Sequence, residues 1–146
     1  MIYLLLLIPG GLLFAQNSHQ HAPDQVQQSF HKDYPDAGNA RWSQSNGQWH
    51  ADFNDHSQAD NGEMVAHYDR YGHHVDTHIP YDRNDVPAPV VDHVQLKYRS
   101  AQQYRYTRIE HPNGNEFFQV KVNLHGRAKT VYMDEQGHER HYEDHH

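Results

Sequence analysis

The sequence contains no cysteine and no cluster of basic residues. Without cysteine the chain forms neither a disulfide nor a thiolate metal site, which excludes zinc-ribbon, iron–sulfur and thiol-nucleophile chemistry. The 12 Lys and Arg residues are outnumbered by 19 Asp and Glu and are scattered singly, so no basic stripe is available to neutralise nucleic-acid phosphates. Stability must therefore come from packing alone, and we expect no nucleic-acid partner.

Long apolar runs are missing as well, except at the amino terminus. Residues 2–14 are mostly apolar, but this run is shorter than the about 20 residues that a helix needs to span a bilayer. With Ala15 as a small cleavage residue, residues 1–15 have the pattern of a signal peptide, and residues 16–24 that of a flexible leader. We therefore expect a periplasmic or secreted protein with no membrane insertion after signal cleavage.

The rest of the chain divides into two similar halves. Each half begins with apolar residues spaced i, i+4, i+8, which is one face of a helix. The apolar period then changes to two, and Asn-Gly or Asp-x-x-Gly turns follow at short intervals, which predicts antiparallel strands joined by hairpins. The helix residues are Val26, Phe30 and Tyr34, then Val90, Val94 and Tyr98, and the strands are expected at 40–45, 48–54, 63–69 and 72–79, then at 104–112, 115–124, 127–133 and 138–143.

This pattern predicts an α+β protein built from two tandem repeats, each a helix packed on a four-stranded antiparallel meander sheet. The repeats span residues 25–80 and 90–143, with a proline-rich linker at 81–89. Because each repeat is small enough that a core of its own would be marginal, we expect the two sheets to associate. Strand alternation assigns to the helix-covered side Trp42, Trp49, Ala51, Phe53, Met64, Ala66, Tyr68, Val75 and Ile79, and in the second half Tyr106, Phe118, Val120, Val122, Leu124, Val131 and Met133.

Several of these motifs together resemble the PepSY-like family, which has a β-lactamase-inhibitor-protein-like fold. The resemblance covers residues 25–143 and rests on turn glycines, aromatic core positions and a Tyr-Pro helix stop. It implies an exported, non-catalytic module whose relatives bind proteins or peptides and in some cases inhibit peptidases. The motifs are Val26 to Tyr34-Pro35, Trp42, Gly47-x-Trp49-x-Ala51-x-Phe53, Val65-Ala66-x-Tyr68-Asp69-x-x-Gly72, Ile79-Pro80, Val86-Pro87, Glu116-Phe117-Phe118-Gln119-Val120 and Tyr132-Met133-Asp134-x-x-Gly137.

No catalytic residues are predicted. None of the serines stands in a Gly-x-Ser-x-Gly elbow, and His138-Glu139-Arg140-His141 has one residue too few between its histidines for a zincin motif. We therefore expect no enzyme and no required cofactor.

The clearest surplus in the sequence is histidine, with 16 residues. His74, Asp76 and His78 alternate along one predicted strand and share its outward face. If residues 69–72 close a tight turn, His67 lies directly across from His74, and His50 has the same outward parity on the next strand. The set His50, His67, His74, Asp76 and His78 suits zinc, copper or nickel, whereas the second half offers no such set.

Three functional hypotheses therefore stand side by side. The first is a non-catalytic binding module, of which an inhibitor is one form, that recognises an envelope protein or peptide. Its expected anchors are the outward aromatics Tyr71, Phe117 and Tyr132. The second is a periplasmic transition-metal-binding protein, and the third a pH sensor that gains charge on mild acidification. Against the metal-binding hypothesis, exposed strand positions need polar residues and can carry histidine without any ligand role.

Overall fold

The computed structural model describes residues 20–55 and 62–142. The predicted signal peptide and residues 16–19 of the predicted leader lie outside this part of the chain. Within it, no helix has the length and apolar character needed to cross a membrane. The elements in order are α1 (Asp24–Asp33), β1 (Arg41–Ser45), β2 (Gln48–Phe53), β3 (Met64–Tyr68), β4 (His74–Tyr81), α2 (Ala88–Lys97), β5 (Gln103–Glu110), β6 (Glu116–Leu124), β7 (Arg127–Met133) and β8 (Glu139–Arg140).

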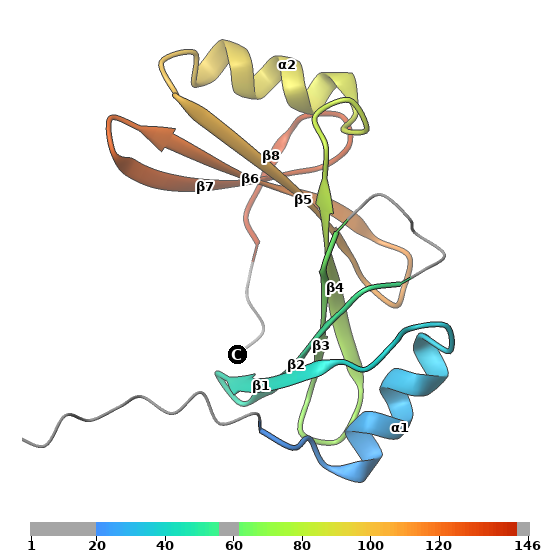
Figure 1. The fold of residues 1–146 in the computed structure, drawn as a ribbon. Coiled ribbons are helices and arrows are strands. Elements are labelled where there is room, and N and C mark those ends of the chain that lie inside the picture. The colour runs from blue at the N-terminus through green and yellow to red at the C-terminus, as the bar shows by residue number, and fades with distance from the viewer. Residues whose placement is uncertain (1–19, 56–61, 143–146) are drawn as a thin grey trace, which may run out of the picture.

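All eight strands belong to one antiparallel sheet whose spatial order follows the sequence, β1 to β8 (Figure 1). The two expected four-stranded sheets therefore associate edge to edge as one continuous sheet. β4 runs on to Tyr81, inside the expected linker, and pairs with β5 over five residues from Thr77↔Glu110 to Tyr81↔Tyr106. This pairing satisfies the backbone groups that two sheets would each have left open at an edge.

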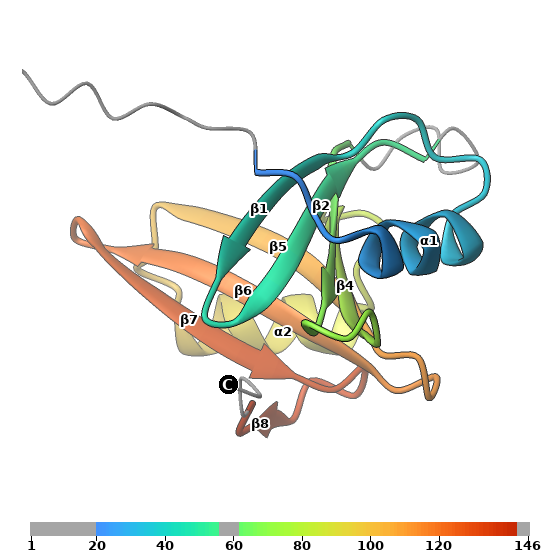
Figure 2. The ribbon, with the colours of Figure 1, turned by 90° about the horizontal axis from the view of Figure 1, so that it is seen from below.

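Both helices pack on the same face of this sheet (Figure 2). Phe30 of α1 is buried against the first half, and Val90 and Val94 of α2 are buried against the second. Tyr81 contacts both clusters and joins them into one layer. The predicted helix-side residues of both halves all belong to these clusters except Val75, so the alternation is confirmed at every other position.

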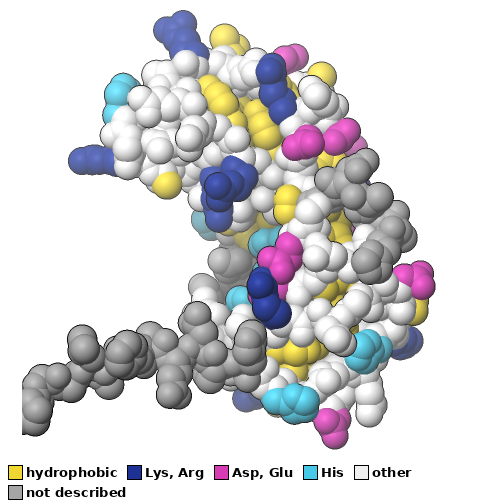
Figure 3. Space-filling model, in the orientation of Figure 1, with side chains coloured by type: hydrophobic (Ala, Val, Ile, Leu, Met, Phe, Trp, Pro, Cys, Tyr) yellow, Lys and Arg dark blue, Asp and Glu magenta, His cyan; other side chains and the backbone are white. Residues whose placement is uncertain are grey.

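The opposite face carries no helix in the part of the chain described and is curved inward. Figure 3 shows a crescent whose hollow side displays histidine, acidic and basic side chains. We call this surface the hollow face. It is the side to which residues of outward parity point, such as His50 and His67 in the first half and Phe117 in the second.

The local sequence explains where each helix begins and ends. α1 starts directly after Pro23 and carries Asp24 in its first turn, where a carboxylate is favoured by the helix dipole. The helix ends at Asp33, two residues before Pro35, because a proline cannot continue a helix. α2 begins at Ala88, so Pro89 lies inside its first turn and not just before it.

The hairpin between β3 and β4 departs from the predicted register. The chain reverses with Asp69 N–H bonded to the carbonyl of His73, so Tyr68 pairs with His74. One residue further the register shifts again, at a β-bulge, and His67 pairs with Asp76. The predicted His67–His74 pair is therefore wrong, and Val75 lies at the bulge and not on the helix side.

Each half closes its third hairpin with an equivalent Asp-x-x-Gly turn. Oδ1 of Asp69 accepts backbone hydrogen bonds from Tyr71 (2.8 Å) and His73 (2.9 Å). Oδ1 of Asp134 likewise accepts from the backbone N–H of Gln136 and of His138. Burial raises the pKa of both carboxyl groups, but these N–H donors, with the side chain of His73 beside Asp69 and that of Arg140 beside Asp134, outweigh it and hold each pKa below its ordinary value.

This lowered pKa predicts a loss of stability in acid. The unfolded carboxyl has a pKa of about 3.9, so the two groups stabilise the fold above that pH, and the contribution disappears as the pH falls through the lower folded value. We expect the free energy of unfolding to drop below about pH 4, and Asp69→Asn with Asp134→Asn to make that drop shallower. Urea unfolding between neutral and strongly acid pH measures it, and an unchanged acid slope in the double variant would contradict this origin.

Candidate functional site

The first-half histidines of the hollow face lie on three neighbouring strands. His50 of β2 is directly across from His67 of β3, and His67 is directly across from Asp76 of β4. His78 follows two residues along β4 and pairs with Val65. The ring centroids of His50 and His67 are 4.4 Å apart, and those of His67 and His78 are 4.6 Å apart. Strand pairing thus gathers these four side chains, which we call the histidine cluster.

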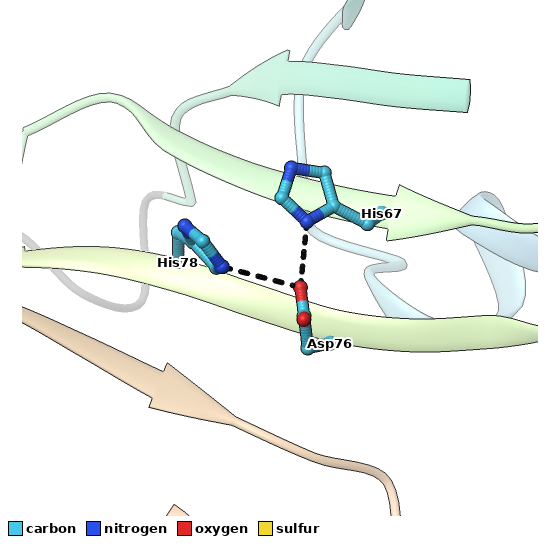
Figure 4. Close-up of side chains that lie close together, drawn as sticks. All are labelled: His67, Asp76 and His78. Atoms are coloured by element: carbon cyan, nitrogen blue, oxygen red, sulfur yellow. Dashed lines mark hydrogen bonds and ion pairs between the residues drawn. The ribbon is translucent and has the colours of Figure 1, made fainter. Parts of the chain in front are cut away.

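Asp76 is the centre of the histidine cluster (Figure 4). Its side chain is almost fully buried, and Oδ1 lies 2.6 Å from Nδ1 of His67 and 3.4 Å from Nε2 of His78. The phenol of Tyr142 donates a 2.7 Å hydrogen bond to Oδ2. Burial raises the pKa of Asp76, but the contacts with His67, His78 and Tyr142 outweigh it and hold the pKa well below its usual range. The carboxylate is therefore an anion surrounded by nitrogen and hydroxyl groups.

His74, predicted as a member of the set, lies on the other face of the sheet. Its ring stacks on Tyr68 at 5.1 Å, and its Nε2 is 2.8 Å from Oγ1 of Thr77. The side chain is partly enclosed beneath α1, and this burial lowers the pKa of His74. The reason is the longer hairpin: pairing His74 with Tyr68 gives it the helix-side orientation of Tyr68.

The histidine cluster lines a cavity of about 180 Å³ on the hollow face. Asn46 and Gln48 of the β1–β2 hairpin border it on one side, and Gln119, Tyr132 and Tyr142 on the other. The cavity is thus built by both halves of the chain. His50 lies at the edge of this cavity, and its pKa is lowered mainly by burial and to a lesser degree by the neighbouring His67.

The three aromatics predicted as partner anchors are not together. Phe117 and Tyr132 both lie on the hollow face, where the ring of Tyr142 connects them: it stacks on Tyr132 at 4.6 Å and lies 6.3 Å from Phe117. Tyr71 is 59% exposed in the β3–β4 turn, with the guanidinium of Arg70 4.8 Å above its ring. Phe117, Tyr132 and Tyr142 form one surface, from which Tyr71 is separate.

Tyr142 is the functional candidate that sequence reasoning missed. β8 contains only two paired residues, and the chain after it returns to the hollow face, where Tyr142 reaches Asp76 across 66 positions of sequence. Sequence periodicity gave no signal for it, because the face of Tyr142 follows from the pairing of Arg140, two residues earlier, with Tyr132.

Chemically, the site offers two kinds of contact. The imidazole nitrogens and the Asp76 carboxylate are donors of the type that transition metals take. The adjoining tyrosines and phenylalanine offer contact area of the type found at the centre of protein interfaces.

No protein-family model matches the sequence, and no curated protein is significantly similar to it. Solved structures, however, are similar in fold. A DUF2874 family protein from Bacteroides uniformis has a TM-score of 0.71 at 21% identity, with 82% of this chain and 86% of that chain covered. A predicted periplasmic protein from Bacteroides eggerthii has a TM-score of 0.72 at 21% identity over the same shares.

A third structure is a BLIP-like protein from Bacteroides fragilis, with a TM-score of 0.68 and 22% identity. The match covers 88% of this chain and 94% of that one. Membership of the PepSY-like family stays a prediction, since no family model matches the sequence. The fold expected from that resemblance is confirmed: this chain has the BLIP-like α+β fold.

Proposed function

We propose that this protein is an exported, non-catalytic binding module whose hollow face recognises a protein or peptide of the cell envelope. The observation that carries the proposal is the division of the sheet into two unlike faces. The two helices cover one face, and the other is a curved surface that bears histidine, acidic and basic side chains (Figure 3). The rings of Phe117, Tyr132 and Tyr142 also lie on this surface. The predicted signal peptide supports export, as does the periplasmic description of the Bacteroides eggerthii neighbour.

The hollow face is large enough for a specific interface. The seven longer strands, β1 to β7, at about 4.8 Å spacing give a sheet roughly 30 Å wide. These strands contain 5 to 9 residues, which is about 17–30 Å at about 3.3 Å per residue, so the face has a flat area of roughly 500–900 Å². That area is of the order of the about 800 Å² that one partner buries in a standard complex. Phe117 and Tyr132 are suitable anchors, because aromatic side chains combine contact area with little loss of conformational freedom.

The charge on the hollow face favours a partner with acidic groups. Arg105 of β5 is directly across from Lys121 of β6, and both side chains are exposed. Two like charges at a cross-strand pair repel each other, so a carboxylate placed between them would relieve that cost. An inhibitor-like action on an envelope enzyme is the form of binding that similarity to a BLIP-like protein favours.

The order of elements, one helix and four strands seen twice, supports an origin from a duplicated unit. On that hypothesis the cavity lies where the two copies of the unit meet, so the partner surface arose only when the copies joined into one sheet.

The test compares two variants of the immobilised protein in extract of the native envelope. Phe117→Ala with Tyr132→Ala removes both anchors of the hollow face, whereas Leu96→Ala, at an exposed position on α2, changes the helix side. We expect the wild type and Leu96→Ala to retain the same partner, and the double variant to bind the purified partner at least about tenfold more weakly. Equal affinity for all three, or no specific partner in repeated experiments, would overturn the proposal.

A further inference from the structure

We propose that His67, Asp76 and His78 form a binding site for a divalent transition metal ion of the zinc, copper and nickel class, with His50 beside it. This goes beyond partner recognition and does not depend on it, because the donor set is complete within one chain. One ligand atom of each of the three residues lies within 4.8 Å of the others (Figure 4).

The spacing of the donors is close to what a metal ion requires. Ligands at about 2.0–2.1 Å from zinc in tetrahedral geometry are about 3.3 Å from one another. Nε2 of His78 and Oδ1 of Asp76 are 3.4 Å apart, and Nδ1 of His67 is 2.6 Å from the same oxygen. Small side-chain rotations therefore suffice to admit an ion, and strand pairing holds the backbone in place.

A second observation points to a ligand at His78. Its Nε2 is buried, and among the described residues no group satisfies it with hydrogen-bond geometry. This nitrogen lies at an ion-pair distance of 3.4 Å from Oδ1 of Asp76, and a buried imidazole nitrogen without a hydrogen bond is uncommon in folded proteins. A coordinated ion would satisfy this nitrogen and would at the same time use the Asp76 charge.

The surroundings of Asp76 match those of metal-binding carboxylates. The hydroxyl of Tyr142 bonds to Oδ2, which leaves Oδ1 directed at the two histidines. Hydrogen bonds of this kind orient a ligand and are part of most protein metal sites. Tyr142 comes from the second half of the chain, so the site is completed by the continuous sheet.

Three protein ligands leave a fourth position, which faces the cavity of the hollow face. The ring of His50 lies 4.4 Å from that of His67 and is the nearest further imidazole. Sites with three protein ligands and one open position keep a water or an external ligand there. An ion in this place would be accessible from solvent.

An exposed pair provides the comparison within the same chain. Nδ1 of His73 lies 2.8 Å from Oδ2 of Asp69, yet the His73 side chain is 79% exposed and this carboxylate serves the β3–β4 turn. It shows the histidine–aspartate contact without the burial and second histidine of the proposed site. His73 is therefore the matched control position.

The experiment measures zinc affinity of the full chain by competition with a chromophoric chelator. His67→Asn with His78→Asn removes two proposed ligands, and His73→Asn with His125→Asn removes two exposed histidines and leaves the same total number. We expect one tight site in the wild type and in the control, and a loss of affinity of at least about 100-fold in the first variant. Only weak, multiple binding by the wild type, or equal affinity in both variants, would overturn the proposal.

A measurement on the unmodified protein guards against a variant that fails to fold. Substoichiometric zinc is added while ring-nitrogen resonances of the histidines are followed by NMR. Those of His67 and His78 should shift before those of His73 and of the terminal histidines. If the exposed or terminal histidines respond first, the proposed site is absent. No partner is present in either experiment, so failure here leaves the proposed function untouched, and the reverse also holds.

Discussion

Replacement of Phe30 by alanine is expected to lower the free energy of unfolding by about 3–5 kcal/mol, because it leaves a cavity at the centre of a buried aromatic group. Phe30 is fully buried, and its ring lies 4.9 Å from that of Phe53 and 5.5 Å from that of Trp42. These rings connect α1 to the strands that carry the histidine cluster. With a total stability of about 5–15 kcal/mol for a typical domain, the variant should melt about 10 °C or more below the wild type.

The matched control is Phe117→Ala, a phenylalanine of the hollow face that is only partly buried. This substitution removes the same atoms, but the Phe117 ring contacts chiefly the rings of His111 and Tyr142. The decrease in the free energy of unfolding should therefore be markedly smaller. Chemical and thermal unfolding measure both. Equal losses in the two variants would mean that the α1 cluster contributes no more to stability than a surface side chain.

The second large effect is expected for Gly137→Ala, at the Asp-x-x-Gly turn of the second half. Gly137 has φ +79°, and an added Cβ would lie 2.5 Å from the carbonyl oxygen of Pro89 in the first turn of α2. Left-handed backbone costs an alanine about 1–2 kcal/mol, and overpacking against rigid backbone adds about 1–3 kcal/mol. We expect a total loss of roughly 3 kcal/mol, measured as the change in free energy of unfolding in urea.

Two other glycines separate the backbone strain from the contact. Gly114 has φ +83°, but among the described residues nothing lies within 4 Å of the place that an added Cβ would take, so alanine there reports the conformational cost alone. Gly72 has φ +85° and is intermediate, with Gln25 O and Ser29 Oγ both at 3.0 Å. The losses should therefore rank Gly137, Gly72, Gly114. A loss at Gly114 as large as at Gly137 would show that the approach of the turn to α2 is unimportant.

These glycines also explain how the two halves hold their helices. Each Asp-x-x-Gly turn lies against the first turn of the helix of its own half, Gly72 near Gln25 and Gly137 near Pro89. Gln25 adds a 2.9 Å hydrogen bond from Nε2 to the carbonyl of Arg70. The turns thus anchor both helices on one side of the sheet, and the hollow face stays open for ligands.

Much of this arrangement follows from local sequence. A strand has a side-chain period of two, so alternation alone predicts which residues point toward the helices and which point away. That is why the cores around Phe30 and Val90 were predicted, and why the outward orientation of His50, His67, Asp76 and His78 was expected. Turn glycines are equally local, because positive φ is a property of one residue.

Register and sheet continuity, by contrast, were decided by tertiary structure. The β3–β4 hairpin is one residue longer than expected, which turns His74 toward Tyr68, and the bulge then restores Asp76 and His78 to the hollow face. A one-residue slip reverses a side chain's face but leaves the sequence pattern unchanged, so periodicity cannot reveal it. Likewise, only the pairing of β4 with β5 merges the halves and brings Tyr142 to Asp76. Away from the β3–β4 bulge, the sequence alone determined which residues face outward. Long-range pairing decided which of them meet, because backbone hydrogen bonds between distant strands carry no signature in local sequence.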